Sequence, residues 1–396
     1  MQDLHTGQNK YISLWLKIMC LAIICMIFIG GLTRLTNSGL SITEWKPITG
    51  IVPPLTEKSW TQEFNKYRQS PEYLKINNSI DLPEFKSIFW VEFIHRIAGR
   101  ITGILYLLPL MYFLFSGAIS GAKIFVYLGG LILLIGQGFA GWYMVKSGLV
   151  SSPHVSHFRL AIHLLLAISL YAILFWQLMK QSFDIILISS KIHLSGINLW
   201  LNISLIFLFI QITFGAFVAG LDAGLVYNEF PLMGNSFVPT EIIFKNLTLE
   251  SFYDPVFVQF VHRILGYIVA ITILVSCFIG FKIQSFLPGL LHNPEMDEEF
   301  LGKTKLRSAS YLNVREHRKQ VLTTKLPSRM SYARGLLSKA LVCVVIALIF
   351  QITAGILTLV YLVPITIALL HQLGAVILLS CLLWAKYLVT PVDELK

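Results

Sequence analysis

The chain has 396 residues, of which 55% are hydrophobic and 13% are charged, with a mean hydropathy of +0.70 and a formal net charge of +10. This small number of charged side chains cannot cover the surface of a water-soluble protein of this size. The composition therefore excludes an ordinary soluble enzyme and indicates a lipid environment. The excess of basic residues is then a topology signal, and we expect no nucleic-acid partner.

Eight stretches are long and apolar enough to cross a hydrocarbon core of about 30 Å, which takes roughly 20 helical residues. Continuous apolar runs indicate helices and not barrel strands, because backbone polar groups in lipid must be paired within their own segment. The sequence therefore predicts an all-α integral membrane protein with eight transmembrane helices. The predicted spans lie near residues 12–31, 90–115, 124–145, 158–178, 198–219, 256–281, 339–360 and 365–385.

Basic residues orient these spans. Residues 282–339 contain eleven Lys or Arg and five acidic residues, whereas 220–255 has Lys245 as its single basic residue. Positive-inside logic predicts that 282–339 and both termini are cytoplasmic and that the loop 32–89 is outside. The N-terminal sequence lacks the Arg- and Ser-rich pattern of a transit peptide, so a bacterial inner (cytoplasmic) membrane is the simplest location. All five cysteines fall in predicted spans, so we expect no exported disulfide.

The sequence repeats itself. "EFIHRIAGR" at 92–100 returns as "QFVHRILGY" at 259–267, and spans one to four align with spans five to eight. Because an even number of helices separates the copies, both copies have the same orientation, which predicts two four-helix bundles, 1–180 and 181–396, related by a pseudo-twofold axis along the membrane normal. A Gln followed by small residues recurs in spans three, five and seven, and we attribute it to close helix packing.

One segment, about 290–331, has no counterpart in the first half. It is polar, mixed in charge and without sustained periodicity. A loop of this length is usually functional or disordered, and we expect a flexible cytoplasmic insertion.

The even-numbered spans each carry one histidine. These are His95, His163, His262 and His371. Each lies near the outer start of its predicted helix, about 8–10 Å below the boundary at about 1.5 Å per residue. Buried imidazoles are rare in membranes and mark functional sites. Paired as His95 with His163 and His262 with His371, the four imidazoles would supply axial ligands for the iron of two haems.

The position four residues after each histidine is small, as a flat macrocycle beside the ligand requires. These residues are Gly99, Ala167, Gly266 and Ala375. Helix packing explains each of them singly. Two rival sites fit less well: a zinc cluster lacks further ligands at suitable spacing except Glu92, and a proton-pumping relay needs a chain of acids that the spans lack.

Glu92 lies three residues before His95 and therefore on the same helical face, whereas the aligned position in the second half is Gln259. A carboxylate beside a haem edge can accept a proton and an amide cannot. We therefore expect chemistry in the N-terminal half and a redox cofactor in the C-terminal half. The alternative is that Glu92 is a helix-start residue favoured by the helix dipole.

Three arginines, Arg34, Arg96 and Arg263, lie at the outer ends of their spans. They could bind haem propionates or extend to lipid headgroups, and the sequence leaves both roles open. His154 and His157 precede the fourth span, and we expect them to be solvated loop residues.

Five blocks of sequence resemble the haem A synthase family. They are "GGLTRLTNSGLSITEWKPITG", "EFIHRIAGRITG", "GLDAGLVYNEFPLMG", "QFVHRILGY" and "LLHQLGAV". The resemblance covers nearly the whole chain apart from 290–331. It implies two four-helix bundles and the oxidation of one methyl group of haem O to the formyl group of haem A. The chain lacks the outer-loop cysteine pair of some members, so it resembles the branch without that pair.

The resemblance also implies roles for the site residues. His95 and His163, with Arg34 and Arg96, would hold the substrate haem, and His262 and His371, with Arg263, would hold a resident haem b. Glu92 would handle protons or stabilise the oxidised carbon.

The implied partners are haem O, haem O synthase (protohaem farnesyltransferase), cytochrome oxidase assembly factors and membrane lipid, with a possible homo-oligomer. Two alternatives remain at this point: a bis-histidine cytochrome b that only carries electrons between quinol and a partner, and a transporter built from repeats.

Overall fold

The structure is a computed structural model that describes residues 2–46, 49–150, 155–182, 195–243, 248–290 and 312–390. Eight helices in these ranges are long and apolar enough to cross a membrane, which confirms the predicted all-α membrane architecture. They are α1 (Gln2–Leu35), α4 (Leu82–Phe115), α5 (Lys123–Val150), α6 (His157–Ser182), α7 (Ser195–Gly220), α9 (Pro255–Leu290), α11 (Leu312–Val360) and α12 (Ile365–Val389).

Helix α4 begins at Leu82, eight residues before the predicted start of its span. Asp81 and Glu84 form a capping box: the Asp81 carboxylate accepts from the Glu84 backbone N–H at 2.9 Å, and Glu84 accepts from the Asp81 N–H at 3.1 Å. Pro83 follows in the first turn, where its missing N–H costs nothing. The helix thus extends out of the apolar segment into the loop region.

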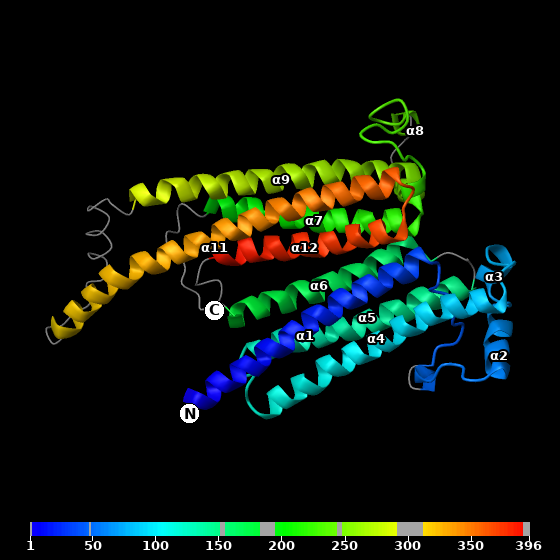
Figure 1. The fold of residues 1–396 in the computed structure, drawn as a ribbon, viewed down its shortest axis with the longest axis horizontal. Coiled ribbons are helices and arrows are strands. Elements are labelled where there is room, and N and C mark those ends of the chain that lie inside the picture. Colours follow the sequence, from blue (N-terminus) through cyan, green and yellow to red (C-terminus); the bar gives the residue numbers. More distant parts are fainter. Residues whose placement is uncertain are drawn as a thin grey trace.

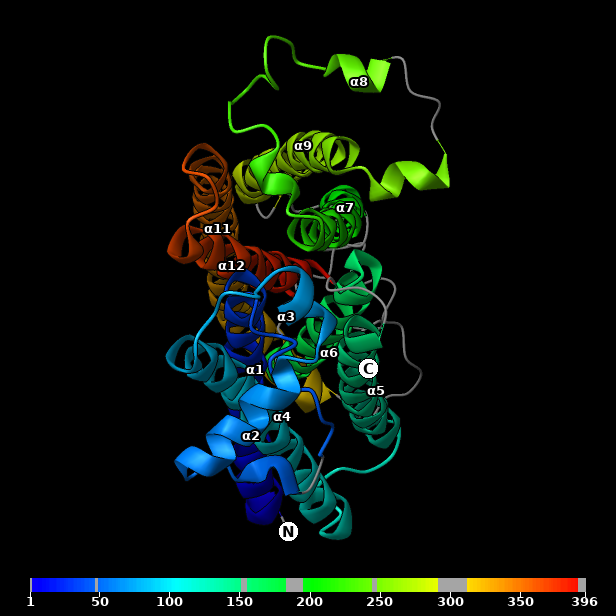
Figure 2. The ribbon, with the colours of Figure 1, turned by 90° about the vertical axis from the view of Figure 1, so that its right-hand side faces the viewer.

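The eight helices form two groups of four, α1, α4, α5 and α6 in one and α7, α9, α11 and α12 in the other (Figures 1 and 2). In the first group α1 contacts α4 and α6, and α5 contacts the same two helices. In the second group α7 contacts α9 and α12, and α11 contacts those two. Between the groups α6 contacts α7 and α12 contacts α1. A twofold relation between the halves would produce these matching contacts, and the relation itself stays a prediction.

One apolar core runs through both groups. Its fully enclosed members include Leu16, Ile168, Leu174, Leu201, Leu341, Leu379 and Leu382. A hydrogen bond of 2.6 Å between the hydroxyls of Tyr171 on α6 and Ser380 on α12 crosses the boundary between the groups. Close packing and interhelical hydrogen bonds are the forces that hold helices together in lipid.

Two loop regions cover one end of the bundle, and α1 begins and α12 ends at the opposite end (Figure 1). The first loop region contains η1 (Thr49–Ile51), α2 (Glu57–Tyr67) and α3 (Pro71–Lys75), and the second contains η2 (Ala223–Leu225), α8 (Thr240–Ile243) and η3 (Leu249–Tyr253). The first has an apolar core of its own with α4, made by Trp60, Tyr67, Phe85 and Phe89. We call residues 49–81 the cap.

Part of the predicted insertion differs from expectation. Residues 312–331 belong to α11 and are helical, and residues 291–311 lie outside the described ranges. The stretch "VREHRKQ" at 314–320 is rich in residues with good helix propensity, so a polar surface did not mean the absence of a helix.

Candidate functional site

The four span histidines lie in two pairs. His95 on α4 and His163 on α6 are close enough for their charges to interact, and so are His262 on α9 and His371 on α12. All four side chains are deeply enclosed by protein and yet keep accessible surface. The predicted partners are the ones that the structure brings together.

Each ring lies against a glycine of a neighbouring helix, so that a Cβ there would meet the ring. The distances from such a Cβ to the nearest ring atom are 3.6 Å for Gly30 and His95, 3.0 Å for Gly141 and His163, 3.3 Å for Gly215 and His262, and 2.7 Å for Gly355 and His371. Interior contacts between carbon atoms normally lie near 3.5–4.0 Å. A Cβ at Gly355 would therefore force the ring to move, and a Cβ at Gly141 or Gly215 would make a tight contact.

Three of these glycines follow a glutamine by four residues, and each glutamine also meets the histidine. The side-chain nitrogen Nε2 of Gln137 lies 3.3 Å from Nε2 of His163, and Nε2 of Gln211 lies 3.3 Å from Nε2 of His262. The main-chain carbonyl of Gln351 accepts from Nδ1 of His371 at 3.2 Å. The recurring Gln that we attributed to helix packing thus contacts the site, and the Gln-x-x-x-Gly spacing was the signal in the sequence.

The contact at His371 fixes the proton on Nδ1 and leaves Nε2 with its lone pair, which is the form of imidazole that binds iron. Within the described residues no three His, Cys, Asp or Glu side chains come together. Two imidazoles complete the coordination of a metal only when it brings equatorial ligands of its own, as haem iron does. The two histidine pairs and the glycine-lined rings therefore fit haem.

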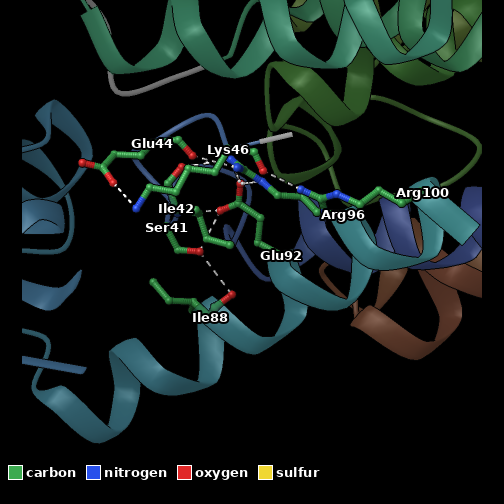
Figure 3. A network of polar contacts seen from close by, with 8 residues as sticks. All are labelled: Ser41, Ile42, Glu44, Lys46, Ile88, Glu92, Arg96 and Arg100. Atoms are coloured by element: carbon green, nitrogen blue, oxygen red, sulfur yellow. Dashed lines mark hydrogen bonds and ion pairs between the residues drawn. The ribbon is translucent and has the colours of Figure 1, made fainter. Parts of the chain in front are cut away.

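Glu92 is 2% exposed and accepts four hydrogen bonds (Figure 3). Oε2 accepts from the Ser41 hydroxyl at 2.7 Å and from the Ile42 N–H at 2.8 Å. Oε1 accepts from Arg96 Nη2 at 2.6 Å and from Nε at 3.0 Å. Two of the four donor atoms belong to the charged guanidinium of Arg96, and hydrogen bonds from a charged donor are the stronger ones. The side chain is thus enclosed within the protein, unlike a helix-start residue at the water boundary.

Arg96 also fastens the first loop region to α4 (Figure 3). Its Nη1 donates to the Glu44 carbonyl at 3.1 Å and its Nη2 to the Ile42 carbonyl at 2.9 Å. One turn along, Arg100 donates to the Lys46 carbonyl at 2.9 Å. A role of Arg96 on a haem propionate stays a prediction.

The second half has the same arginine without the acid. Gln259 donates to the Tyr227 carbonyl at 2.9 Å, and its own Oε1 is buried without a partner among the described atoms. Arg263 donates to the carbonyls of Glu229, Leu232 and Tyr227, each at 2.9 Å. No described carboxylate forms an ion pair with Arg263, and its guanidinium donates to main-chain carbonyls instead.

Arg34 joins the two halves. Its Nη2 forms an ion pair of 2.8 Å with Asp222, which follows α7, and its Nη1 donates to Asn37 at 3.0 Å. The predicted contact with the carboxylates of a substrate haem is not tested by these contacts and stays a prediction.

The expectation of a solvated His157 is wrong. His157 begins α6 and is 3% exposed, because its ring packs against Phe158, Phe217 and Tyr253 with centroids 4.2, 5.2 and 5.1 Å away. Two of these aromatic residues, Phe217 and Tyr253, come from α7 and η3, which no local pattern indicates. His154 lies outside the described residues.

Sequence reasoning also missed Glu72 in the cap. It is 5% exposed and accepts from the Tyr67 hydroxyl at 3.1 Å, and Asn77 in turn donates to that hydroxyl at 2.9 Å. Burial raises the pKa of the Glu72 carboxyl to about 7, and the nearby charge of Glu92 adds to the increase. Acidic residues in polar loops are common, so no local pattern distinguishes Glu72 from the others.

The two glycines that follow His95 and His262 by four residues meet side chains of a neighbouring helix. A Cβ on Gly99 would lie 3.6 Å from Cε of Met26, and a Cβ on Gly266 would lie 3.5 Å from Nε2 of Gln211. Met26 and Gln211 thus occupy equivalent places in the two halves, each four residues before the glycine that faces a histidine.

Known proteins resemble the chain along nearly its whole length. The profile of the COX15-CtaA family, described as cytochrome oxidase assembly protein, matches residues 13–290 and 321–383. Heme A synthase of Rickettsia felis is 44% identical over 382 residues, which cover 96% of this chain and 99% of that protein. Heme A synthase of Rickettsia conorii is 44% identical over 384 residues, and that of Rickettsia bellii is 41% identical over 381 residues, both with the same coverage. The unmatched residues 291–320 fall in the predicted insertion.

Proposed function

The chain belongs to the COX15-CtaA family of cytochrome oxidase assembly proteins, and from this premise we propose that it is a haem A synthase. It is a membrane oxidoreductase that converts haem O to haem A by oxidising one methyl group to a formyl group. The bis-histidine cytochrome b and the transporter, which the sequence left open, do not account for an acid that is present in one half alone.

The observation that carries the proposal is the difference between Glu92 and Gln259. The two halves present the same helix, histidine and arginine, but only the first holds a carboxylate, one helical turn before His95. Oxidation of a methyl group releases protons, and a carboxylate can accept them where an amide cannot. We assign the substrate to the first half for this reason.

We propose that His95 and His163 hold the substrate haem O and that His262 and His371 hold a resident haem b. When bound, the resident haem supplies one-electron transfer to an acceptor. The glycines that face the rings support a role of these histidines as ligands, because they leave room for each imidazole beside a neighbouring helix.

The residues around Glu92 fix the position of its carboxylate. Arg96 holds Oε1, while Ser41 and the Ile42 N–H hold Oε2. A proton from the substrate would go to a carboxylate oxygen, and the Ser41 hydroxyl can rotate to release Oε2 for it. Because the side chain is 2% exposed, bulk water competes little for that proton.

We also propose the cellular setting. The protein would span a bacterial inner (cytoplasmic) membrane several times, with both termini cytoplasmic, which the basic residues of 282–339 support. Haem O synthase would supply its substrate, and cytochrome oxidase assembly factors would receive its product.

Glu92→Gln tests the function directly, because it keeps the shape of the side chain and removes its ability to accept a proton. We expect the purified variant to keep both haems and to lose haem A formation by at least about 100-fold. The measurement is pigment extraction from membranes and from purified protein, with haems B, O and A separated. Normal haem A formation would contradict the proposal.

Gln259→Glu is the matched control in the other half. It adds a carboxylate beside Arg263 without changing Glu92, so haem A formation should persist. Loss of haem A in this variant with both haems bound would mean that chemistry is not confined to the first half.

A further inference from the structure

An open apolar groove lies where the two groups of helices meet. It has a volume of about 630 Å³, and its walls are formed by α5 and α6 of the first group and α12 of the second. Clefts that hold small molecules usually measure about 300–1,000 Å³. Apart from the amide of Gln177 the lining side chains are apolar, and they include Val126, Leu133, Ala172, Trp176 and Leu383. We call it the α5/α6 groove, and none of the four site histidines lines it.

Two lysines lie at one end of this groove, the end of the bundle at which α1 begins and α12 ends (Figure 1). Lys123 begins α5, one helical turn before Val126, and Lys180 lies one turn after Trp176 on α6. Residues one turn apart share a helix face, so both lysines continue the lining of the groove. The two ammonium groups are close enough for their charges to interact. The apolar groove therefore ends in a pair of positive charges.

The charges of these two lysines are not balanced by acidic side chains of the described residues. Neither Lys123 nor Lys180 forms an ion pair with a described carboxylate. A third lysine, Lys386, lies one turn beyond the groove residue Leu383 on α12, and its ammonium group donates to Oδ1 of Asn198 on α7. Two like charges side by side repel each other, so an anion between Lys123 and Lys180 would stabilise both.

The second half lacks this pair of lysines. When spans four and eight are aligned on their histidines, Leu388 stands in the place of Lys180. When spans three and seven are aligned on their glutamines, Leu337 stands in the place of Lys123. The nearest lysine on α11, Lys339, has no such neighbour at the aligned position. Lysines near helix ends are common in membrane proteins, but the repeat by itself does not produce this pair.

We propose that the α5/α6 groove binds one anionic phospholipid, with an acyl chain along the apolar lining and the phosphate between Lys123 and Lys180. The inference goes beyond the proposed function and does not depend on it. Basic pockets between transmembrane helices bind anionic headgroups in this way. Because the walls come from both groups of helices, the bound lipid contacts both halves of the molecule.

The two parts of the site select this ligand together. The acyl chain of an uncharged lipid would fill the apolar lining equally well, but its headgroup would leave the two ammonium groups uncompensated. A free phosphate ion would pair with the lysines and leave the apolar walls without an occupant. One lysine near a membrane surface favours an anionic lipid by about fivefold, so two lysines favour it by about 20- to 30-fold.

Trp176 reports on the occupant of the groove, because a lipid with bromine atoms on its acyl chains quenches the fluorescence of a tryptophan that it touches. The purified, haem-containing protein is placed in phosphatidylcholine vesicles, and brominated phosphatidylglycerol or brominated phosphatidylcholine is added in increasing proportion. The chain has eight tryptophans, so the signal of Trp176 is the difference between the unaltered protein and Trp176→Phe. We expect half-quenching of Trp176 at an about 20- to 30-fold lower proportion of the anionic lipid than of the neutral lipid.

Lys123→Gln and Lys180→Gln should each reduce this preference by about fivefold. Lys339→Gln is the matched control on α11 and should leave it unchanged. Lys123→Arg and Lys180→Arg keep the charge and should keep the preference, which separates loss of charge from damage to the fold. The proposal is overturned if the two lipids quench Trp176 equally in the unaltered protein. It is also overturned if the arginine variants or Lys339→Gln lose the preference as the glutamine variants of the pair do.

Discussion

The two halves of the molecule have nearly the same framework and different charges. In the first half the guanidinium of Arg96 is neutralised by Glu92, while in the second half Arg263 meets three main-chain carbonyls. Both arginines fasten a loop to the helix that carries a histidine. The comparison teaches that the arginine serves the architecture, so the acid can be present or absent without loss of the fold, and the difference is free to serve chemistry.

The loop regions of the two halves also differ, and the one over the first half is the more structured. The cap over the first half has two helices and an apolar cluster, in which Trp60 packs on Phe89 at 5.0 Å and Tyr67 on Phe85 at 5.2 Å. The second loop region has only short helical turns among its described residues. The half that holds the acid is thus the half with the more substantial cover, as the exclusion of water from a reacting site requires.

Removing the histidines should have the largest effect. These variants test whether the two halves have different roles. His262→Ala or His371→Ala should reduce resident haem by more than about 10-fold, because removing even an outer-shell partner of a metal ligand lowers metal affinity by about 10-fold. His95→Ala or His163→Ala should mainly impair turnover. Pyridine haemochrome spectra of the purified variants measure this, and identical haem loss in all four would contradict separate roles.

A smaller effect should follow from adding one methyl group beside a ring. Gly355→Ala would put Cβ 2.7 Å from Cε1 of His371, so the ring must move, and we expect several-fold lower haem retention. Gly30→Ala would meet His95 at 3.6 Å, an ordinary contact, and should retain haem nearly normally. The haem-to-protein ratio after purification gives the order. Equal loss in both variants would mean that the rings are not held as the structure has them.

The smallest effect concerns the cap and its dependence on pH. The pKa of Glu72 is raised from about 4.5 to about 7, so between these values the closed cap holds one more proton than the opened cap. Its stability should therefore be highest below about pH 4.5, fall by up to about 3 kcal/mol as pH rises to 7, and change little above. Hydrogen exchange of α2 and α3, corrected for intrinsic rates, measures this.

Glu72→Gln is the control for that measurement. It keeps an oxygen that can accept from Tyr67 and removes the titration, so the protection of the cap should become independent of pH in this range. An unchanged pH profile in the variant would assign the titration to another group.

Much of the fold was predictable because membrane physics is restrictive. The eight spans follow from apolar length alone, and the pairing of His95 with His163 and of His262 with His371 follows from the repeat. The start of α4 was predicted too late because an apolar window ignores its polar first turns. The capping box at Asp81 and Glu84 was readable in the sequence.

The site was predictable where a residue is unusual for its surroundings and not where it is ordinary. Imidazoles and a carboxylate within apolar segments are unusual and are easily recognised in the sequence. Gln137 and Gln211 are ordinary helix residues, and only the structure shows that they contact a histidine ring. His157 and Glu72 were missed for a related reason: distant segments bury them, and burial by distant segments leaves no local pattern.

The ion pair between Arg34 and Asp222 connects the two halves at the loop end of the bundle. Asp222 is 59% exposed, so dissolved ions screen the attraction, over a Debye length of about 8 Å at physiological ionic strength. Deeper in the bundle the halves meet through apolar side chains, on which salt has no such action. Concentrated electrolyte should therefore weaken the exposed ion pair between the two halves, whereas a harsh detergent should weaken the apolar contacts deeper in the bundle.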